Sequence, residues 1–493
     1  MNNKNFKIHI NSAEYRDKVL ACWIGKNIGG TMGAPYEGTH DVLDVKGFES
    51  KPGAPLPNDD LDLQLVWLHA AEKLGSRCID SRTLGLFWRS FIVAWWNEYG
   101  VCQTNMKRGL TPPLCGDYMN GWRNSNGAWI RTEIWACLFP GAPEAAVKYS
   151  KEDASVDHGS GEGTVAAAFV AAMQSCAFTI NDIRSCIELA LDSIPEGSRT
   201  ADTIRLAISC FDKKMPIVDA RNLIQARNAD MADGWFEAPS NVAYAILGLL
   251  YGEGDFKKSM LFAINCGDDT DCTAATVGAT LGILGGTAAI PDDWRDYIGD
   301  GIITLALNRT GAGARLPKSC TELTDRVAAL APHMLFEVGA GVALSEGETV
   351  LPNNITDYYR KACENLRKIE FLPPYSAKYA TPLVTVVTTL DSAPDIAPMD
   401  EKKIHITFHN NSGVFDAISY SLSFRWILPE GFRVSGKSSF YMKHNYLRSP
   451  KEERSLDFTI TSGEHIDAKN KCILEITIED TPEMIYIPFV FFG

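Results

Sequence analysis

The feature that most constrains the fold of this 493-residue chain is a change of hydrophobic period near residue 371. Before this point, apolar residues recur at three- and four-residue steps, which is the pattern of amphipathic helices. After it, apolar residues alternate with polar ones, or β-branched and aromatic residues run together, as they do in short strands. The chain therefore has to form a helical body followed by a β region.

The helical pattern is clearest in three segments rich in Ala and Leu, at residues 60–74, 164–178 and 183–191. Clusters of Gly, Pro, Asn and Asp separate such segments and mark the turns between helices. We therefore predict a mainly α domain over residues 1–370.

The β region begins after FLPPYSAKYATP, residues 371–382, whose prolines predict a linker. Strand-like segments then follow one another at short intervals, among them 383–390, 403–410, 455–461 and 473–478. Several short strands in roughly 110 residues fit a small antiparallel sandwich. We predict an immunoglobulin-like accessory β-sandwich over residues 383–493, with no catalytic cluster of its own.

The net charge of -14 argues against a nucleic-acid partner and against an anionic membrane surface. No apolar run approaches the ~18–20 residues of a transmembrane helix. The N-terminus lacks the apolar core of a secretory signal. The 13 cysteines show no zinc-binding spacing, so we expect reduced thiols in a cytoplasmic protein.

The first candidate site is an acidic helix start in PNDDLDLQLVWLHAAEKLG, residues 57–75. Asn58 is a natural N-cap. Asp59 and Asp60 would lie in the first turn, where unpaired N–H groups and the helix dipole favour negative charge. Taken alone, this pattern indicates only a well-capped helix.

The second candidate is NCGDDTDCTAATVGATLG, residues 265–282, in which Asp269 and Asp271 precede a helix of very small residues. Such a helix can pack close to its neighbours and bring its N-terminus deep into the protein. Buried carboxylates are costly unless they are paired or bind a metal. Because the nearby ligands are mostly oxygens, the pattern favours Mg²⁺, with Mn²⁺ or Ca²⁺ as alternatives, over zinc. The spacing excludes an EF-hand.

The third candidate is ACWIGKNIGGTMGAPYEG, residues 21–38. Gly25, Gly29 and Gly33 recur every four residues, which predicts a bare helix face in close contact with another helix. The spacing is not that of a dinucleotide-binding loop. The stretch ends at Glu37, a carboxylate in a Gly/Pro turn and a reasonable position for a reactive acid.

These three pieces and NSNGAWIR, residues 124–131, together resemble the ADP-ribosylglycohydrolase family over about residues 15–310. The resemblance implies an all-α orthogonal bundle with two Mg²⁺ ions in a cleft. It implies metal ligands at Asn58, Asp59, Asp60, Asp269, Asp271 and Cys272. It also implies catalytic roles for Glu37 and Asp60, and substrate contacts from Ser125, Asn126, Gly127, Trp129 and His158.

The chain departs from the family pattern at three positions. Asn58 stands where the family usually has Thr, and Leu61 where it often has Thr or Ser. Cys272 replaces a Thr at the second acidic site, and a thiol is a poor ligand for Mg²⁺. One or two ions are therefore expected, with Asp62 or Asp268 as substitute ligands for the second.

Three functions remain open. The first is a metal-dependent hydrolase that cleaves the glycosidic bond of an ADP-ribosyl group or a related riboside; Lys26 and Arg131 would then be candidates to meet its diphosphate. The second is a glycosidase acting on another furanoside or glycan, and the third is a catalytically silent ligand-binding protein. Trp95 and Trp96 are expected in the core.

Overall fold

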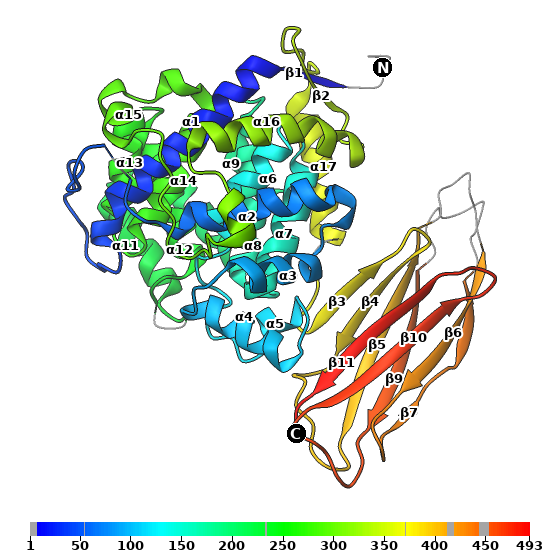
Figure 1. The fold of residues 1–493 in the computed structure, drawn as a ribbon. Coiled ribbons are helices and arrows are strands. Elements are labelled where there is room, and N and C mark those ends of the chain that lie inside the picture. The colour runs from blue at the N-terminus through cyan, green and yellow to red at the C-terminus, as the bar shows by residue number, and fades with distance from the viewer. Residues whose placement is uncertain (1–6, 54, 232–233, 370, 412–418, 443–452) are drawn as a thin grey trace. The chain divides into compact units, whose positions relative to one another are not determined.

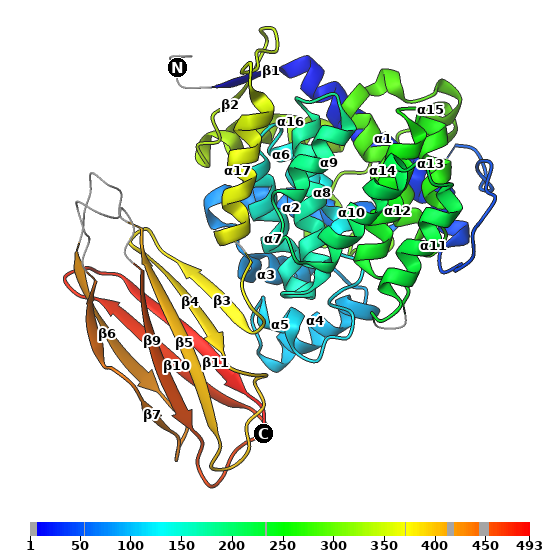
Figure 2. The same cartoon turned by 180° about the vertical axis from the view of Figure 1, so that it is seen from behind.

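The computed structural model describes residues 7–53, 55–231, 234–369, 371–411, 419–442 and 453–493. The chain divides into two compact units. The first comprises residues 1–101 and 120–371, and the second comprises residues 102–119 and 372–493. Figures 1 and 2 show helices throughout the first unit and two β-sheets in the second.

The first unit is a helical bundle, which confirms the mainly α prediction. Its α-helices are α1 (Ser12–Gly33), α2 (Asp59–Leu74), α3 (Ser81–Phe91), α6 (Glu133–Leu138), α7 (Pro143–His158), α8 (Glu162–Ala177), α9 (Ile183–Leu191), α10 (Arg199–Asp212), α11 (Ile217–Asn228), α12 (Ala238–Gly252), α13 (Phe256–Ile264), α14 (Thr270–Gly285), α15 (Asp292–Ile298), α16 (Cys320–Glu337) and α17 (Ile355–Ile369). The short parallel strands β1 (Ile8–Asn11) and β2 (Val342–Ser345) also belong to this unit. The predicted helices 60–74, 164–178 and 183–191 correspond to α2, α8 and α9.

Helices α1 and α14 pack against each other through their small residues. A Cβ atom added at Gly25 would lie 2.2 Å from the carbonyl oxygen of Gly278, and one at Gly29 would lie 2.3 Å from Ala274. At the end of α1, a Cβ at Gly33 would lie 2.4 Å from the backbone nitrogen of Asp271. The contacts run in opposite directions along the two helices. The bare face of α1 therefore brings its C-terminal end to the acidic N-terminus of α14.

The second unit is an antiparallel β-sandwich, as predicted. One sheet has the strand order β11-β10-β6-β8 and the other β3-β4-β5-β9-β7. The strands are β3 (Ser376–Ala380), β4 (Val384–Leu390), β5 (Glu401–Asn410), β6 (Tyr420–Ile427), β7 (Arg433–Ser435), β8 (Ser439–Met442), β9 (Glu453–Thr461), β10 (Asn470–Ile478) and β11 (Met484–Phe491). The immunoglobulin-like topology of this domain stays a prediction.

The core of the sandwich lies between the two sheets, because the alternating residues of each strand face inward. The ring centroids of Phe408 on β5 and Phe424 on β6 are 5.6 Å apart, and those of Phe424 and Phe458 on β9 are 5.7 Å apart. The alternation of apolar and polar residues in the sequence thus arises because each sheet buries one face.

Two features of the second unit bear on the predicted boundaries. Strand β3 lies inside residues 371–382, the range predicted as a linker. The unit also includes residues 102–119, which hold the end of α4 (Asn97–Arg108) and all of α5 (Leu114–Asp117). The boundaries 1–370 and 383–493 remain a proposal for the domain organisation. No helix among the described residues is long and apolar enough to span a membrane.

Candidate functional site

The turn before α14 holds the Glu37 loop in place. The Asp268 backbone N–H donates to the Thr39 carbonyl at 2.7 Å, and the Gly38 N–H donates to the Asp268 carbonyl at 2.9 Å. Gly267, with a φ of 75°, allows this close pairing, since a Cβ there would lie 2.4 Å from the Asp41 carbonyl oxygen. Glu37 is therefore carried to the edge of the α14 N-terminus.

The first two acids of the α14 start are buried and lack partners on one side. Asp269 and Asp271 are 4% and 6% exposed. Each has an Oδ1 atom with no hydrogen-bond partner among the described residues. Burial, followed by repulsion from neighbouring carboxylates, raises the pKa of Asp269 to about 8 and that of Asp271 well above its ordinary value. A cation placed beside these two side chains would stabilise their charged forms.

The α2 start converges on the same point. The Asn58 Oδ1 accepts from the Asp60 backbone N–H at 2.6 Å and so caps the helix, as the sequence indicates. Its Nδ2 lies 3.4 Å from the Asp271 Oδ2, and the Cys272 thiol lies 3.4 Å from the Asp60 Oδ1. Residues more than 200 positions apart in sequence therefore meet in one acidic cluster, which we define as Glu37, Asp59, Asp60, Asp269 and Asp271.

Glu37 and Asp59 form the less buried side of the acidic cluster. Glu37 is exposed and Asp59 is half-buried. The partial desolvation of Glu37, together with the Asp59 charge, raises its pKa. Burial also raises the pKa of Asp59, although the Tyr99 hydroxyl, 3.1 Å from the Asp59 Oδ2, opposes this effect. A carboxyl at the exposed edge with a raised pKa can exchange protons with a bound molecule.

The donor set of the acidic cluster fits a hard divalent cation. Three buried carboxylate oxygens lack a hydrogen-bond partner among the described residues: Asp60 Oδ2, Asp269 Oδ1 and Asp271 Oδ1. Potential ligand atoms of Asp269, Asp271 and Cys272 all lie within 4.8 Å of one another. Carboxylate oxygens are the ligands that Mg²⁺, Mn²⁺ and Ca²⁺ prefer. The Cys272 thiol faces Asp60 and adds little to such a site.

The two substitute ligands considered for a second ion are engaged elsewhere. The Asp62 Oδ2 accepts from the backbone N–H groups of Leu305 and Ala306 at 2.7 and 2.5 Å. The Asp268 carboxylate accepts from the Phe236 N–H and from the Asn241 amide, the latter at 2.8 Å. Both acids therefore hold neighbouring loops together, but the Asp62 Oδ1 has no hydrogen-bond partner among the described residues, so a role for Asp62 in place of Cys272 stays a prediction.

The predicted substrate loop reaches the acidic cluster through one residue. The Asn126 Nδ2 donates to the Asp269 Oδ2 at 2.7 Å, and the Trp129 indole N–H donates to the Asn126 Oδ1 at 2.9 Å. Trp129 is fully buried and holds the Asn126 side chain through this bond, and a substrate contact for it stays a prediction. Gly127 lies against Glu98, where a Cβ would be 2.0 Å from the Glu98 Oε1. A side chain at position 127 would therefore clash with the Glu98 carboxylate.

Ser125 and His158 form a buried polar chain beside the same loop. The Ser125 hydroxyl donates to the Glu98 Oε2 at 2.9 Å and lies 3.2 Å from the His158 Nε2. The His158 Nδ1 lies 2.9 Å from the Asp157 Oδ1, at ion-pair distance but without hydrogen-bond alignment. His158 is fully buried. This arrangement favours ordering of the loop over direct contact between His158 and a ligand.

The two basic residues proposed for a diphosphate are both buried in ion pairs, so that expectation is wrong. Arg131 lies 2.9 Å from Asp153 and 2.7 Å from Asp157. The Lys26 Nζ lies 3.1 Å from the Glu133 Oε1 and 3.7 Å from the Asp60 Oδ2. Burial alone would lower the pKa of Lys26, but the two carboxylates raise it overall.

The aromatic residues beside the acidic cluster also differ from expectation. Trp95 and Trp96 are 47% and 42% exposed, so their predicted place in the core is wrong. Trp96 stacks on Tyr99, with ring centroids 6.0 Å apart, and Tyr99 contacts Asp59. Tyr99 and Glu98 were not predicted from the sequence, and the run WWNEY, residues 95–99, which sets an acid and a tyrosine beside two tryptophans, is the local signal that could have identified them.

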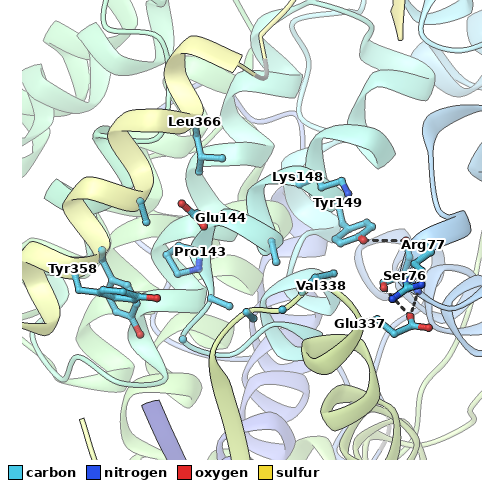
Figure 3. A pocket seen from close by; sticks show the side chains of 17 residues that line it. Ser76, Arg77, Pro143, Glu144, Lys148, Tyr149, Glu337, Val338, Tyr358 and Leu366 are labelled. Carbon is cyan, nitrogen blue, oxygen red and sulfur yellow. Dashed lines mark hydrogen bonds between the residues drawn. The ribbon is translucent and has the colours of Figure 1, made fainter. Parts of the chain in front are cut away.

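A separate pocket of about 420 Å³ opens on the helical unit between η3 (Ser76–Cys78), α7, α16 and α17. Figure 3 shows Tyr149 and Glu337 bonded to Ser76 on one side and Tyr358 on the other. None of the residues predicted from the sequence to form a site lines this pocket. The acidic cluster is thus a distinct site on the same unit.

Known proteins resemble this chain in its family and over parts of its length. The family model described as ADP-ribosylglycohydrolase matches residues 11–329. A solved structure entitled "ADP-ribosylglycohydrolase-related protein complex" is 20% identical over 66% of this chain and 99% of its own, with a TM-score of 0.44. A search among curated proteins found no match.

Two shorter solved structures are also similar to part of the chain. A FixG-related protein from Vibrio parahaemolyticus is 11% identical over 23% of this chain and 98% of its own, with a TM-score of 0.18. The GAE domain of GGA2p from Saccharomyces cerevisiae is 13% identical over 24% of this chain and 97% of its own, with a TM-score of 0.15. Because the family model matches well over half of the sequence, the chain belongs to the ADP-ribosylglycohydrolase family.

Proposed function

We propose that this chain is a metal-dependent glycohydrolase that cleaves the glycosidic bond of an ADP-ribosyl group or a related riboside. The observation that carries the proposal is the meeting of two acidic helix starts whose buried carboxylate oxygens lack partners among the described residues. Family membership supports hydrolase activity. The proposal adds the site residues, the metal and the bond that is cleaved.

Asp59, Asp269 and Asp271 would hold the metal, which we propose to be Mg²⁺, and Asp60 would lie at the edge of the same cluster. When bound, such an ion supplies a positive charge that polarises water and orients sugar hydroxyls. Asn126 donates to Asp269 and fixes the orientation of that carboxylate. Asn58 caps α2 through its amide oxygen, so its part is to set the helix start.

Glu37 is the proposed proton carrier. Its exposed carboxylate would take a proton from the water that attacks the anomeric carbon. The leaving atom would take the electron pair of the broken bond and a proton from solvent. The transition state would resemble an oxocarbenium ion, as in other glycosidic cleavages. A raised pKa suits this role, since a general base works best when its pKa lies near the working pH.

The test is an assay of hydrolysis on the full chain with Mg²⁺ or with EDTA. ADP-ribosyl-arginine, ADP-ribosyl-serine and nitrophenyl furanosides would serve as substrates. We expect Mg²⁺-dependent release of the leaving group from at least one of them. Asp269→Asn and Asp271→Asn should each lower the rate about 100-fold or more, because a lost ligand exceeds the 10–100-fold effect of an outer-shell partner.

Asp292→Asn is the matched control. Asp292 also lies in the first turn of a helix, α15, but its side chain is 83% exposed and pairs with Arg295. This variant should keep the wild-type rate. Full activity in EDTA, or full activity in both cluster variants, would contradict the proposal.

A second candidate is hydrolysis of a neutral furanoside without a diphosphate. One observation favours it: Lys26 and Arg131 are both committed to buried ion pairs and cannot meet a diphosphate. The substrate panel separates the two candidates, because only the first predicts faster turnover of ADP-ribosyl compounds than of nitrophenyl furanosides.

A further inference from the structure

The environment of Asp60 differs from that of the other acids in the acidic cluster. Its Oδ1 lies 3.4 Å from the Cys272 thiol, and its Oδ2 lies 3.7 Å from the Lys26 Nζ. Both side chains of the ion pair are almost fully buried. Asp60 therefore already has a cation beside it, supplied by the protein itself.

The Lys26 ammonium is held in this position from behind. It lies 3.1 Å from the Glu133 Oε1. The Gln64 amide donates to the Glu133 Oε2 at 3.0 Å, and the Gln174 amide lies 3.3 Å from the Glu133 Oε1. Glu133 is thus anchored by two amides, so Lys26 bridges a fixed carboxylate and Asp60. A buried charge with two such partners does not swing out to solvent without leaving both carboxylates unpaired.

Little room for an ion is left between Asp60 and helix α1. The cavity lined by Lys26, Asn58 and Asp60 has a volume of about 10 Å³. A single water molecule needs about that much space. A Mg²⁺ ion demands near-octahedral coordination and usually keeps several waters. The amide oxygen of Asn58 is also engaged, because it caps α2.

The carboxylates at the start of α14, unlike Asp60, have no cationic side chain at ion-pair distance among the described residues. Asp269 and Asp271 each keep a buried oxygen without a partner among the described residues. The unpaired carboxylate oxygens on this side therefore belong to Asp269 and Asp271, with Asp59 beside them at the less buried edge.

We infer that Lys26 acts as a built-in cation for Asp60, so that the chain binds one divalent ion, at Asp59, Asp269 and Asp271, instead of two. This inference rests on the proposed function, since it takes the acidic cluster to be the metal site. It names Lys26 as a positioning residue that sets the number of ions. The Cys272 thiol lies on the other side of this carboxylate, 3.4 Å from the Asp60 Oδ1.

The test is the stoichiometry of Mn²⁺ binding to the full chain by isothermal titration calorimetry. We expect one ion per chain for the wild type. The variant Cys272→Thr, which restores the hydroxyl but leaves Lys26, should also bind one. The triple variant Lys26→Met, Glu133→Gln and Cys272→Thr removes the buried ion pair as a unit, and it should bind two.

Each result decides the inference. Two ions on the wild-type chain would overturn it while leaving the proposed function intact. Zero ions on the wild type would overturn both. A folded triple variant, judged by circular dichroism, that still binds one ion would overturn the role of Lys26. If the triple variant does not fold, the wild-type stoichiometry and Cys272→Thr still decide between one ion and two.

Discussion

At the residue scale, the proposed chemistry rests on carboxylates held where their charge is unfavourable. Asp269 and Asp271 are almost completely buried, and several other acids surround them. A fold retains such groups at a cost to its own stability unless a cation offsets the charge. Strongly perturbed carboxyls in one place are typical of functional sites.

This arrangement predicts a pH-dependent stability. The pKa of Asp269 is about 8 in the folded chain and about 3.9 in an unfolded one. Between these values the metal-free folded state holds more protons than the unfolded state, so its stability falls as pH rises. Mg²⁺ competes with those protons, so the increase in melting temperature on adding Mg²⁺ should grow from pH 5 to pH 8. An increase that shrinks over this range would contradict the metal site.

A substitution at Asn126 tests whether its hydrogen bond orients a metal ligand of the acidic cluster. Its amide holds the Asp269 Oδ2 at 2.7 Å, so Asn126→Ala should weaken Mg²⁺ binding about 10–100-fold. The control is Asn228→Ala, which removes another buried amide, bonded to Ser240 at 3.0 Å. Calorimetric titration should find the Mg²⁺ affinity unchanged in that control. Equal affinities in both variants would show that Asn126 does not orient a ligand.

At the element scale, the site depends on how closely α1 and α14 approach. Three glycines of α1 leave no room for side chains on the facing side, and Gly278 and Gly282 do the same on α14. The contact brings the start of α14 next to the Glu37 loop. The positions of the side chains in the acidic cluster therefore depend on the packing of α1 against α14, which lies outside the cluster.

Gly29→Ala tests this dependence. The added Cβ would lie 2.3 Å from the Ala274 backbone, so the two helices would have to separate. We expect a loss of about 1–3 kcal/mol in unfolding free energy, as for other overpacked sites, together with weaker Mg²⁺ binding. Urea denaturation measures the first effect. Gly197→Ala, at a position with open space, should change neither quantity.

The elements with local signals could be predicted from the sequence. The capping of α2 by Asn58 could be predicted because a cap depends only on the next few residues. The four-residue glycine spacing likewise predicts the contact face of α1. The Lys26–Glu133 pair could not be predicted, since the partners are 107 positions apart and meet only through tertiary packing. Trp95 and Trp96 also escaped prediction, because composition does not separate a buried tryptophan from an exposed one.

At the scale of the whole molecule, the chain combines a helical unit that carries the acidic cluster with a β-sandwich unit. The sandwich unit takes in residues 102–119 as well as the C-terminal strands. Within it, the Arg108 guanidinium lies 4.0 Å from the ring centroid of Phe492, and the Tyr375 N–H donates to the Asp117 Oδ2 at 3.1 Å. Residues next to the C-terminal strands therefore contact a segment from the first quarter of the sequence.

A chain truncated after residue 371 should show the consequence. Residues 102–119 would lose the aromatic and hydrogen-bond partners that Phe492 and Tyr375 provide. We expect a lower melting temperature and new protease cleavage within 102–119, detected by limited proteolysis and mass spectrometry. Arg108→Ala in the full chain is the milder companion variant. Unchanged resistance of this segment in the truncated chain would contradict its assignment to the sandwich unit.

The most direct test of the central claim is a crystal structure of the full chain grown with Mn²⁺ and measured for anomalous scattering. The account predicts an anomalous peak bounded by carboxylate oxygens of Asp59, Asp269 and Asp271. A well-ordered acidic cluster with no peak among these side chains, or with Mn²⁺ bound only elsewhere, would contradict it.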